Sequence, residues 1–161
     1  MLSELGQVFP IFVFGKIEVN MSVELVFTVL SRFSLVGWLL LAILPNLKLT
    51  KVLVRSGLWS AILSAAYFLI LATNRGSDGN FQSLAGVAAL FSNSWVLLAG
   101  WVHYLAFDLL LGIWETKEAE SVGLSRWILI PCLFLTLMVG PIGFLIFYVI
   151  RIIKGGFNVN L

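Results

Sequence analysis

The sequence predicts an all-α polytopic membrane protein, a bundle of four transmembrane helices with a short re-entrant or interfacial helix before the third span. The first observation is composition: the chain has 161 residues, of which 60% are hydrophobic and only 11% are charged. Soluble domains carry about 25% charged residues. The second is that four apolar runs approach the roughly 20 residues that a helix needs to cross a bilayer. A chain of this length forms a single domain, here a membrane domain.

The first two spans are expected at about 25–44 and 52–72. The first run ends at Pro45, which cannot continue a helix, and Asn46 beside it favours a turn. The second run ends at "TNRGSDGN", whose glycine, asparagine and aspartate residues form turns. The sequence therefore predicts a helical hairpin here.

The third and fourth spans are expected at about 95–114 and 127–150. The stretch "SLAGVAALF" before the third run is too short to cross a bilayer, so a re-entrant or interfacial helix is expected there. "GPIG" (140–143) places a proline inside the fourth run, which predicts a kink with a closely packed neighbour. Such a kink either serves packing alone or opens a pocket beside the helix.

Residues 1–20 are expected to be an upstream extension or an interfacial segment, with Met21 as the native start, because the first clear apolar run begins just after it. They lack the basic region and the cleavage site of a signal peptide. With four spans, the loops on one side carry five basic residues and the other side carries four. The cluster of Lys48, Lys51 and Arg55 favours cytoplasmic loops and termini outside the cytoplasm.

Several function classes find no support in the composition. The net charge of +2 is too scattered for a nucleic-acid partner, which needs a clustered basic face. The single cysteine, Cys132, cannot form an internal disulfide. One histidine without clustered cysteines predicts no metal site, and no nucleotide-binding motif predicts a cofactor.

The third run contains three titratable residues, His103, Asp108 and Glu115. At about 100° per residue, Asp108 and Glu115 share a helix stripe and His103 lies on another. Arg32 lies a third of the way into the first run. A charge at the bilayer centre costs about 2.5–3.5 kcal/mol, so Asp108 needs a partner such as Arg32 or His103. This partner serves either bundle stability or function, whereas Glu115 is expected to be a solvated boundary residue.

An imidazole and a buried carboxyl group can act as a general acid and base. Five residues apart on one helix, His103 and Asp108 face different sides. They can border one cavity only if other helices close around it.

The stretches "GWVHYLAFDLLLG" (100–112), "SLAGVAALF" (83–91) and "GPIGFLIFYVIR" (140–151) resemble the abscisic-acid-deficient-four-like family. The resemblance covers roughly 30–151, and "HYLAFDL" is similar to the motif of bacterial members. Plant members are associated with converting violaxanthin to neoxanthin in plastid membranes. The resemblance thus implies an integral protein of a bacterial inner or photosynthetic membrane.

The resemblance also implies a cofactor-independent carotenoid or isoprenoid epoxide isomerase that uses acid–base catalysis at His103 and Asp108. Expected partners are membrane lipid, an apolar polyene or isoprenoid ligand, and a second copy in a homodimer. Aromatic residues of the bundle either line a ligand tunnel or merely pack, and Arg32 is added to this substrate-binding set from its depth alone. That set is Arg32, Trp38, Trp101, Tyr104 and Phe107. The alternative is a non-catalytic pigment-binding or scaffold protein in which Arg32 pairs with Asp108.

Overall fold

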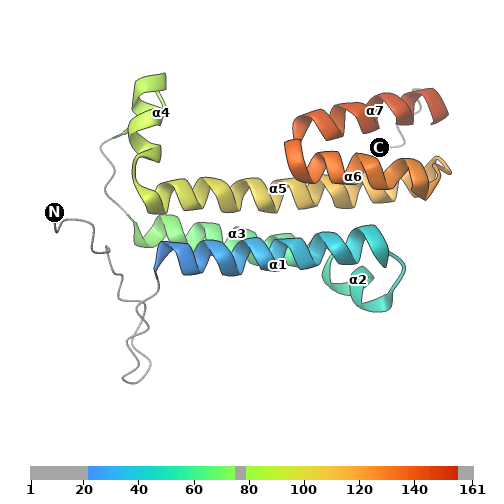
Figure 1. Ribbon diagram of the computed structural model, residues 1–161, viewed down its shortest axis with the longest axis horizontal. Coiled ribbons are helices and arrows are strands. Elements are labelled where there is room, and N and C mark those ends of the chain that lie inside the picture. Colours follow the sequence, from blue (N-terminus) through green and yellow to red (C-terminus); the bar gives the residue numbers. More distant parts are fainter. Residues whose placement is uncertain (1–21, 75–78, 156–161) are drawn as a thin grey trace.

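The computed structural model describes residues 22–74 and 79–155, and these form seven α-helices. The predicted all-α class is confirmed (Figure 1). The expectation about residues 1–20 and Met21 falls outside the described residues.

The first and third predicted spans are present as α1 (Val23–Ile43) and α5 (Ser94–Ser121). Each begins at a capping side chain: the Ser22 hydroxyl accepts a hydrogen bond from the Leu25 N–H, and the Asn93 side chain accepts from the first turn of α5. Both helices are long and apolar enough to cross a membrane, judged by length and composition. At about 1.5 Å per residue, α5 is about 42 Å long.

The second predicted span starts later than expected. A short helix, α2 (Lys48–Leu53), is followed by a turn, and α3 runs over Leu58–Thr73. Gly57 lies in this turn with φ +88°, a left-handed conformation that glycine adopts without strain. The expected helix over 52–72 is therefore interrupted near its start.

The short apolar stretch before the third span is helical, as predicted. It forms α4 (Leu84–Phe91), whose first turn is capped by the Ser83 hydroxyl, an acceptor for the Gly86 N–H. Figure 1 shows α4 projecting from the beginning of α5.

The expected continuous helix over 127–150 is wrong. This segment forms two helices, α6 (Arg126–Val139) and α7 (Pro141–Gly155), which fold back on each other as a hairpin (Figure 1). Gly140 between them has φ +43°, and Pro141 opens α7, a position where its missing N–H costs no helical hydrogen bond. A Cβ on Gly143 would lie 2.1 Å from the Thr136 backbone nitrogen, so only glycine allows the two helices to approach this closely.

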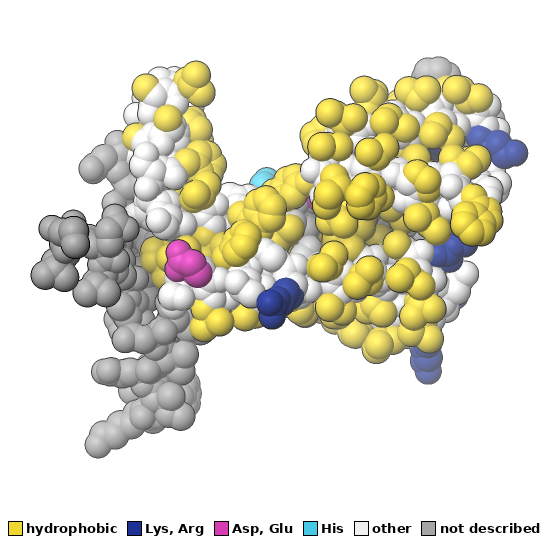
Figure 2. Space-filling model, in the orientation of Figure 1, with side chains coloured by type: hydrophobic (Ala, Val, Ile, Leu, Met, Phe, Trp, Pro, Cys, Tyr) yellow, Lys and Arg dark blue, Asp and Glu magenta, His cyan; other side chains and the backbone are white. Residues whose placement is uncertain are grey.

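Helix α5 is the centre of the fold and packs against α1, α3, α4, α6 and α7. The core includes buried Leu109 of α5, Leu63 of α3, Leu133 of α6 and Phe147 of α7. The remaining surface is largely hydrophobic, and Figure 2 shows it hollowed between α4 and the α6–α7 hairpin.

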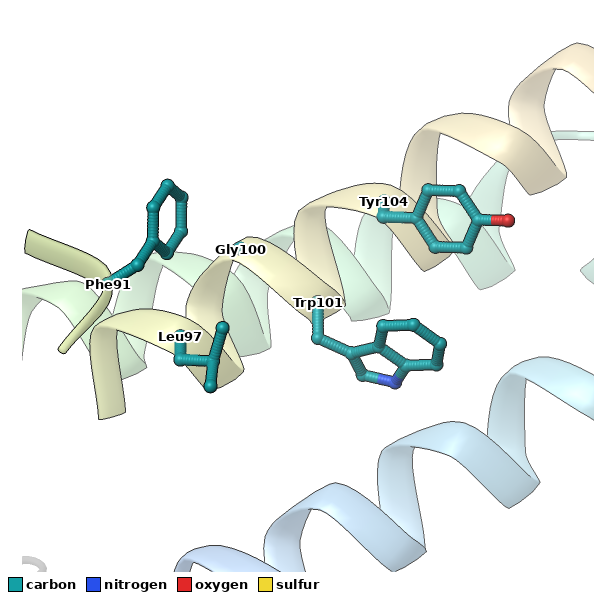
Figure 3. Close-up of a pocket in the computed structure, with 5 residues that line it drawn as sticks. All are labelled: Phe91, Leu97, Gly100, Trp101 and Tyr104. Carbon is teal, nitrogen blue, oxygen red and sulfur yellow. The ribbon is translucent and has the colours of Figure 1, made fainter. Parts of the chain in front are cut away.

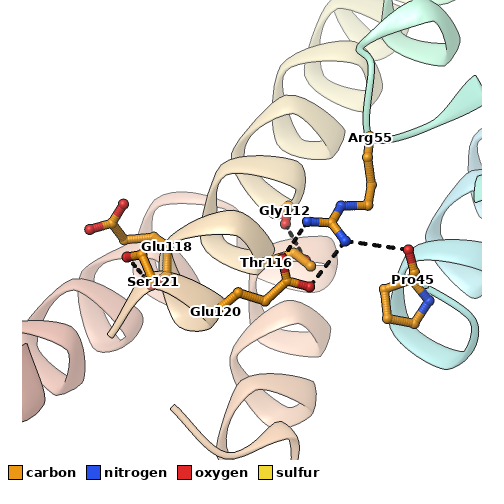
Figure 4. A network of polar contacts seen from close by, with 7 residues as sticks. All are labelled: Pro45, Arg55, Gly112, Thr116, Glu118, Glu120 and Ser121. Atoms are coloured by element: carbon orange, nitrogen blue, oxygen red, sulfur yellow. Dashed lines mark hydrogen bonds and ion pairs between the residues drawn. The ribbon is translucent and has the colours of Figure 1, made fainter. Parts of the chain in front are cut away.

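Ion pairs fasten the polar end of α5 to its neighbours. Arg55, just after α2, binds both carboxylate oxygens of Glu120 at 2.5 and 3.0 Å and donates to the Pro45 carbonyl oxygen (Figure 4). Arg151 of α7 donates from Nε to Glu118 at 2.8 Å. The connections before α3 and the end of α7 thus meet at the same end of α5.

Candidate functional site

An apolar groove of about 290 Å³ lies between α4 and the first half of α5. Its lining residues are Phe91, Leu97, Gly100, Trp101 and Tyr104 (Figure 3). We call it the α4–α5 groove. Because the Leu97 and Trp101 side chains are partly exposed, the groove opens to the surface of the helix bundle.

Contacts with neighbouring helices hold the groove walls in place. The Trp101 indole donates from Nε1 to the Ser31 hydroxyl of α1 at 2.9 Å, and its ring lies 5.4 Å from that of Tyr104. Gly100 makes room for Phe91, because a Cβ there would lie 2.6 Å from the Phe91 ring. The groove therefore depends on the small Gly100 facing the large Phe91. The sequence alone does not show this pairing, because it does not show that α4 packs against α5 at this point.

Tyr104 connects the groove to a buried carboxyl group. Its hydroxyl donates to the Leu137 carbonyl oxygen at 3.0 Å, near the end of α6. One helical turn further along α5 lies the carboxyl group of Asp108. In Figure 3 the Tyr104 oxygen points along α5, away from Phe91. Tyr104 thus stands between the groove and Asp108.

Asp108 lies where α6 turns into α7. Its side chain is 6% exposed, and Oδ2 has no hydrogen-bond partner among the described residues. A Cβ on Gly140 would lie 3.1 Å from both carboxylate oxygens, so the hairpin turn closes directly over this group. A buried carboxyl oxygen without a partner is rare in folded proteins and calls for an explanation.

Glu115 is fully buried, and the expectation that it is a solvated boundary residue is wrong. The Thr136 hydroxyl of α6 donates to Glu115 Oε1 at 2.8 Å, whereas Oε2 has no partner within the described part of the chain. The signal in the sequence was its spacing of seven residues from Asp108. That spacing places both carboxyl groups on the stripe of α5 that α6 and α7 cover.

The structure does not bring His103 and Asp108 together. His103 is exposed on another face of α5, where its ring lies 5.5 Å from Tyr67 of α3 and 4.6 Å from Phe107. Phe107 is itself exposed and lies outside the α4–α5 groove.

Arg32 is exposed on α1 and does not pair with Asp108. The ion pairs among the described residues join Arg55 to Glu120 and Arg151 to Glu118. The structural pair expected for a scaffold protein is therefore wrong, because α1 turns Arg32 away from the seam that holds Asp108.

Trp38 belongs to the core instead of a ligand tunnel. It is 3% exposed and packs against α5 at Gly112, where a Cβ would lie 2.6 Å from the indole ring. Of the aromatic residues expected to contact a ligand, Trp101 and Tyr104 line the groove, whereas Trp38 and Phe107 do not.

The arrangement offers a phenol and a buried carboxyl group at the end of an apolar surface. Such a pair can hold a proton and deliver it to an oxygen atom of a bound molecule. Among the described residues, no group of three or more histidine, cysteine or acidic side chains is placed to hold a metal ion.

No curated protein and no solved structure matches the chain significantly. A model of the ABA DEFICIENT 4-like (ABA4-like) protein family does match it, over residues 25–147. This range covers most of the chain, including all but the first two residues of α1, the whole of α2 to α6 and the first half of α7. The chain therefore belongs to the ABA DEFICIENT 4-like family.

Proposed function

We propose that this integral membrane protein binds an elongated isoprenoid, such as a carotenoid epoxide, in the α4–α5 groove and isomerises it by acid–base catalysis. Asp108 is the proton-transferring group, and Tyr104 positions the reacting oxygen and relays the proton. The observation that carries the proposal is that the polar end of an otherwise apolar groove is Tyr104, one helical turn before the buried carboxyl group of Asp108, which has one oxygen without a partner among the described residues.

The groove suits a polyene better than a polar substrate. Its walls are aliphatic and aromatic, and binding sites for small molecules are mostly apolar with a few placed polar groups. Since the groove is open, one end of a long ligand would lie against Trp101 and Tyr104 while the rest extends into lipid.

Opening an epoxide to an allenic alcohol needs one proton in and one proton out. An acid protonates the epoxide oxygen as its carbon–oxygen bond breaks, and a base removes a proton from the adjacent carbon. The reaction is redox-neutral, so no electron carrier enters the balance. A carboxyl group that gives its proton through Tyr104 and takes one back from carbon returns to its starting state.

A non-catalytic pigment-binding or scaffold role is the second candidate. The observation that favours it is that Asp108 and Glu115 both lie in the seam between α5 and the hairpin, and Thr136 already binds one of them. In this role the two carboxyl groups hold helices together, and the groove binds a pigment without converting it.

The decisive experiment compares Asp108→Asn with the parent protein in membranes supplied with a 5,6-epoxy carotenoid such as violaxanthin. Catalysis predicts that Asp108→Asn abolishes turnover while carotenoid uptake and melting temperature stay near those of the parent. Tyr104→Phe should reduce turnover by at least tenfold. Glu24→Gln, the same carboxyl-to-amide change on an exposed residue of α1, is the matched control.

Ligand binding is tested separately by filling the groove. Leu97→Trp should reduce carotenoid uptake several-fold, and Leu69→Trp, an equally exposed leucine on α3, should leave uptake unchanged. Uptake without turnover in the parent protein supports the pigment-binding role. Loss of turnover on His103→Ala with Asp108→Asn still active would move the chemistry to the other face of α5.

A further inference from the structure

We infer that α6 and α7 form a re-entrant hairpin, which enters the membrane from the side of the α5–α6 connection, reaches about half its depth and returns. The chain then crosses the membrane three times, with α1, α3 and α5, and the end of α7 lies on the same side as the connections after α1 and α5. This inference concerns placement in the bilayer and does not depend on the ligand.

The tip of the hairpin lies beside the middle of α5. The Leu137 carbonyl oxygen binds the Tyr104 hydroxyl, and Gly140 packs against Asp108, which stands midway along α5. With 14 residues, α6 is about 21 Å long, shorter than the roughly 30 Å of the hydrocarbon core.

Both ends of the hairpin return to the polar end of α5. Arg126 at the start of α6 donates to the Ala42 carbonyl oxygen near the end of α1. At the end of α7, Arg151 pairs with Glu118, and Gly155 packs closely against Val122. Helix α3 is also short, but it runs alongside α5 from one end to the other. It starts next to α2, at the end of α5, and finishes near α4, at the beginning of α5 (Figure 1).

The surface of the tip fits lipid acyl chains. Its exposed side chains are apolar, namely Met138, Val139, Ile142 and Leu145. Part of the backbone at the turn is hydrogen-bonded within the protein, since the Gly140 N–H donates to the Thr136 carbonyl oxygen and the Phe144 N–H donates to the Gly140 carbonyl oxygen. Non-helical backbone at membrane depth is tolerated only where protein covers it in this way.

The charge distribution supports this orientation. Outside Arg32, which lies within α1, the chain has nine lysine and arginine residues. Three spans and a hairpin place seven of them on one side: Lys48, Lys51, Arg55, Lys117, Arg126, Arg151 and Lys154. By sequence, Lys16 before α1 and Arg75 after α3 are left for the other side. An arrangement with four spans would place five of these basic residues on one side and four on the other. Of the two arrangements, the one with three spans and a hairpin gives the clear excess of basic residues that marks the cytoplasmic side.

Single cysteines in the full-length protein test the inference. Three exposed positions are suitable for this test, in the variants Lys117→Cys, Lys154→Cys and Gln82→Cys. The native Cys132 is buried, so the parent protein should not react with the label and serves as the control. A membrane-impermeant maleimide is applied to right-side-out and inside-out vesicles. We expect Lys154→Cys to react from the same side as Lys117→Cys, and Gln82→Cys from the opposite side.

The depth of the tip is measured with a spin label on Met138→Cys. We expect a spin label at position 138 to collide often with oxygen dissolved in the lipid and rarely with a water-soluble nickel complex. A spin label on Lys154→Cys should collide often with the nickel complex and rarely with oxygen. The inference is overturned if Lys154→Cys is labelled from the side on which Gln82→Cys reacts. It is also overturned if Lys154→Cys is labelled from both sides while Lys117→Cys is labelled from one. A nickel-accessible label at position 138 also overturns it, because the hairpin would then lie outside the bilayer.

Discussion

At the scale of single residues, partners decide what each polar side chain in α5 does. Asp108 and Glu115 face α6 and α7 and are buried, whereas His103 faces outward beside Tyr67. Thr136 supplies one hydrogen bond to Glu115, and each carboxyl group keeps one oxygen without a partner in the described residues. Both oxygens are buried between α5 and the α6–α7 hairpin, and a buried polar atom without a partner calls for a physical explanation.

Thr136→Val should destabilise the protein, because the isosteric change leaves the buried Glu115 carboxyl group without its hydroxyl donor. The expected loss is about 1–3 kcal/mol in free energy of unfolding, the cost of an unsatisfied buried group. It is measured by thermal or denaturant unfolding in detergent. The control is Thr73→Val at an exposed position, where the hydroxyl donates to carbonyl oxygens of its own helix and accepts from the side chain of the neighbouring Asn74.

The double variant Glu115→Leu with Thr136→Val should recover most of this loss, since replacing both partners of a buried polar pair by apolar groups is often neutral. Equal effects of Thr136→Val and Thr73→Val would show that the bond to Glu115 contributes nothing.

At the scale of elements, the Gly140–Pro141 pair decides between two structures of the same apolar run. Inside one long helix, Pro141 would break a hydrogen bond and kink the chain. At the start of α7 the same proline is tolerated, and Gly140 takes the φ of +43° that the reversal needs. Gly143 then permits the close approach of α7 to Thr136 that holds the hairpin shut.

Two neighbouring alanine substitutions distinguish these structures. In the hairpin, Pro141→Ala should change stability by less than about 1 kcal/mol, and Gly140→Ala should destabilise by about 1 kcal/mol or more because of its positive φ and its contact with Asp108. In a continuous helix both changes would stabilise, by about 3 and 1 kcal/mol respectively. Unfolding midpoints of the two variants and the parent protein give the answer.

At the scale of the whole molecule, α5 organises everything else. Its first half carries the α4–α5 groove and its second half carries the hairpin, so Asp108 lies where the two meet. Figure 2 shows that the surface of the molecule is hollowed between α4 and the α6–α7 hairpin. The polar end of α5 binds Arg55 through Glu120 and Arg151 through Glu118, which brings these two basic residues to the same end of the molecule.

Removing part of this basic end should disturb the orientation of the protein in the membrane. Changing Lys48, Lys51 and Lys154 to glutamine reduces the imbalance from seven against two to four against two. We expect a measurable population in the opposite orientation, scored by the side from which Lys117→Cys is labelled. The same three positions changed to arginine keep the charge and should keep a single orientation. A uniform orientation of the glutamine variant would contradict the role of the charges.

The sequence by itself determined the all-α class, the two long helices α1 and α5, the short helix at 84–91 and the family resemblance, because these depend on composition, local periodicity and residue motifs. It also placed Asp108 and Glu115 on one stripe of the helix and His103 on a different stripe. Only the tertiary structure decided that the last apolar run folds back as a hairpin, that Glu115 is buried and that Arg32 faces away from Asp108. The physical reason is that the direction of the chain after Gly140 and the covering of a helix face depend on contacts between distant residues, such as Gly143 with Thr136 and Tyr104 with Leu137.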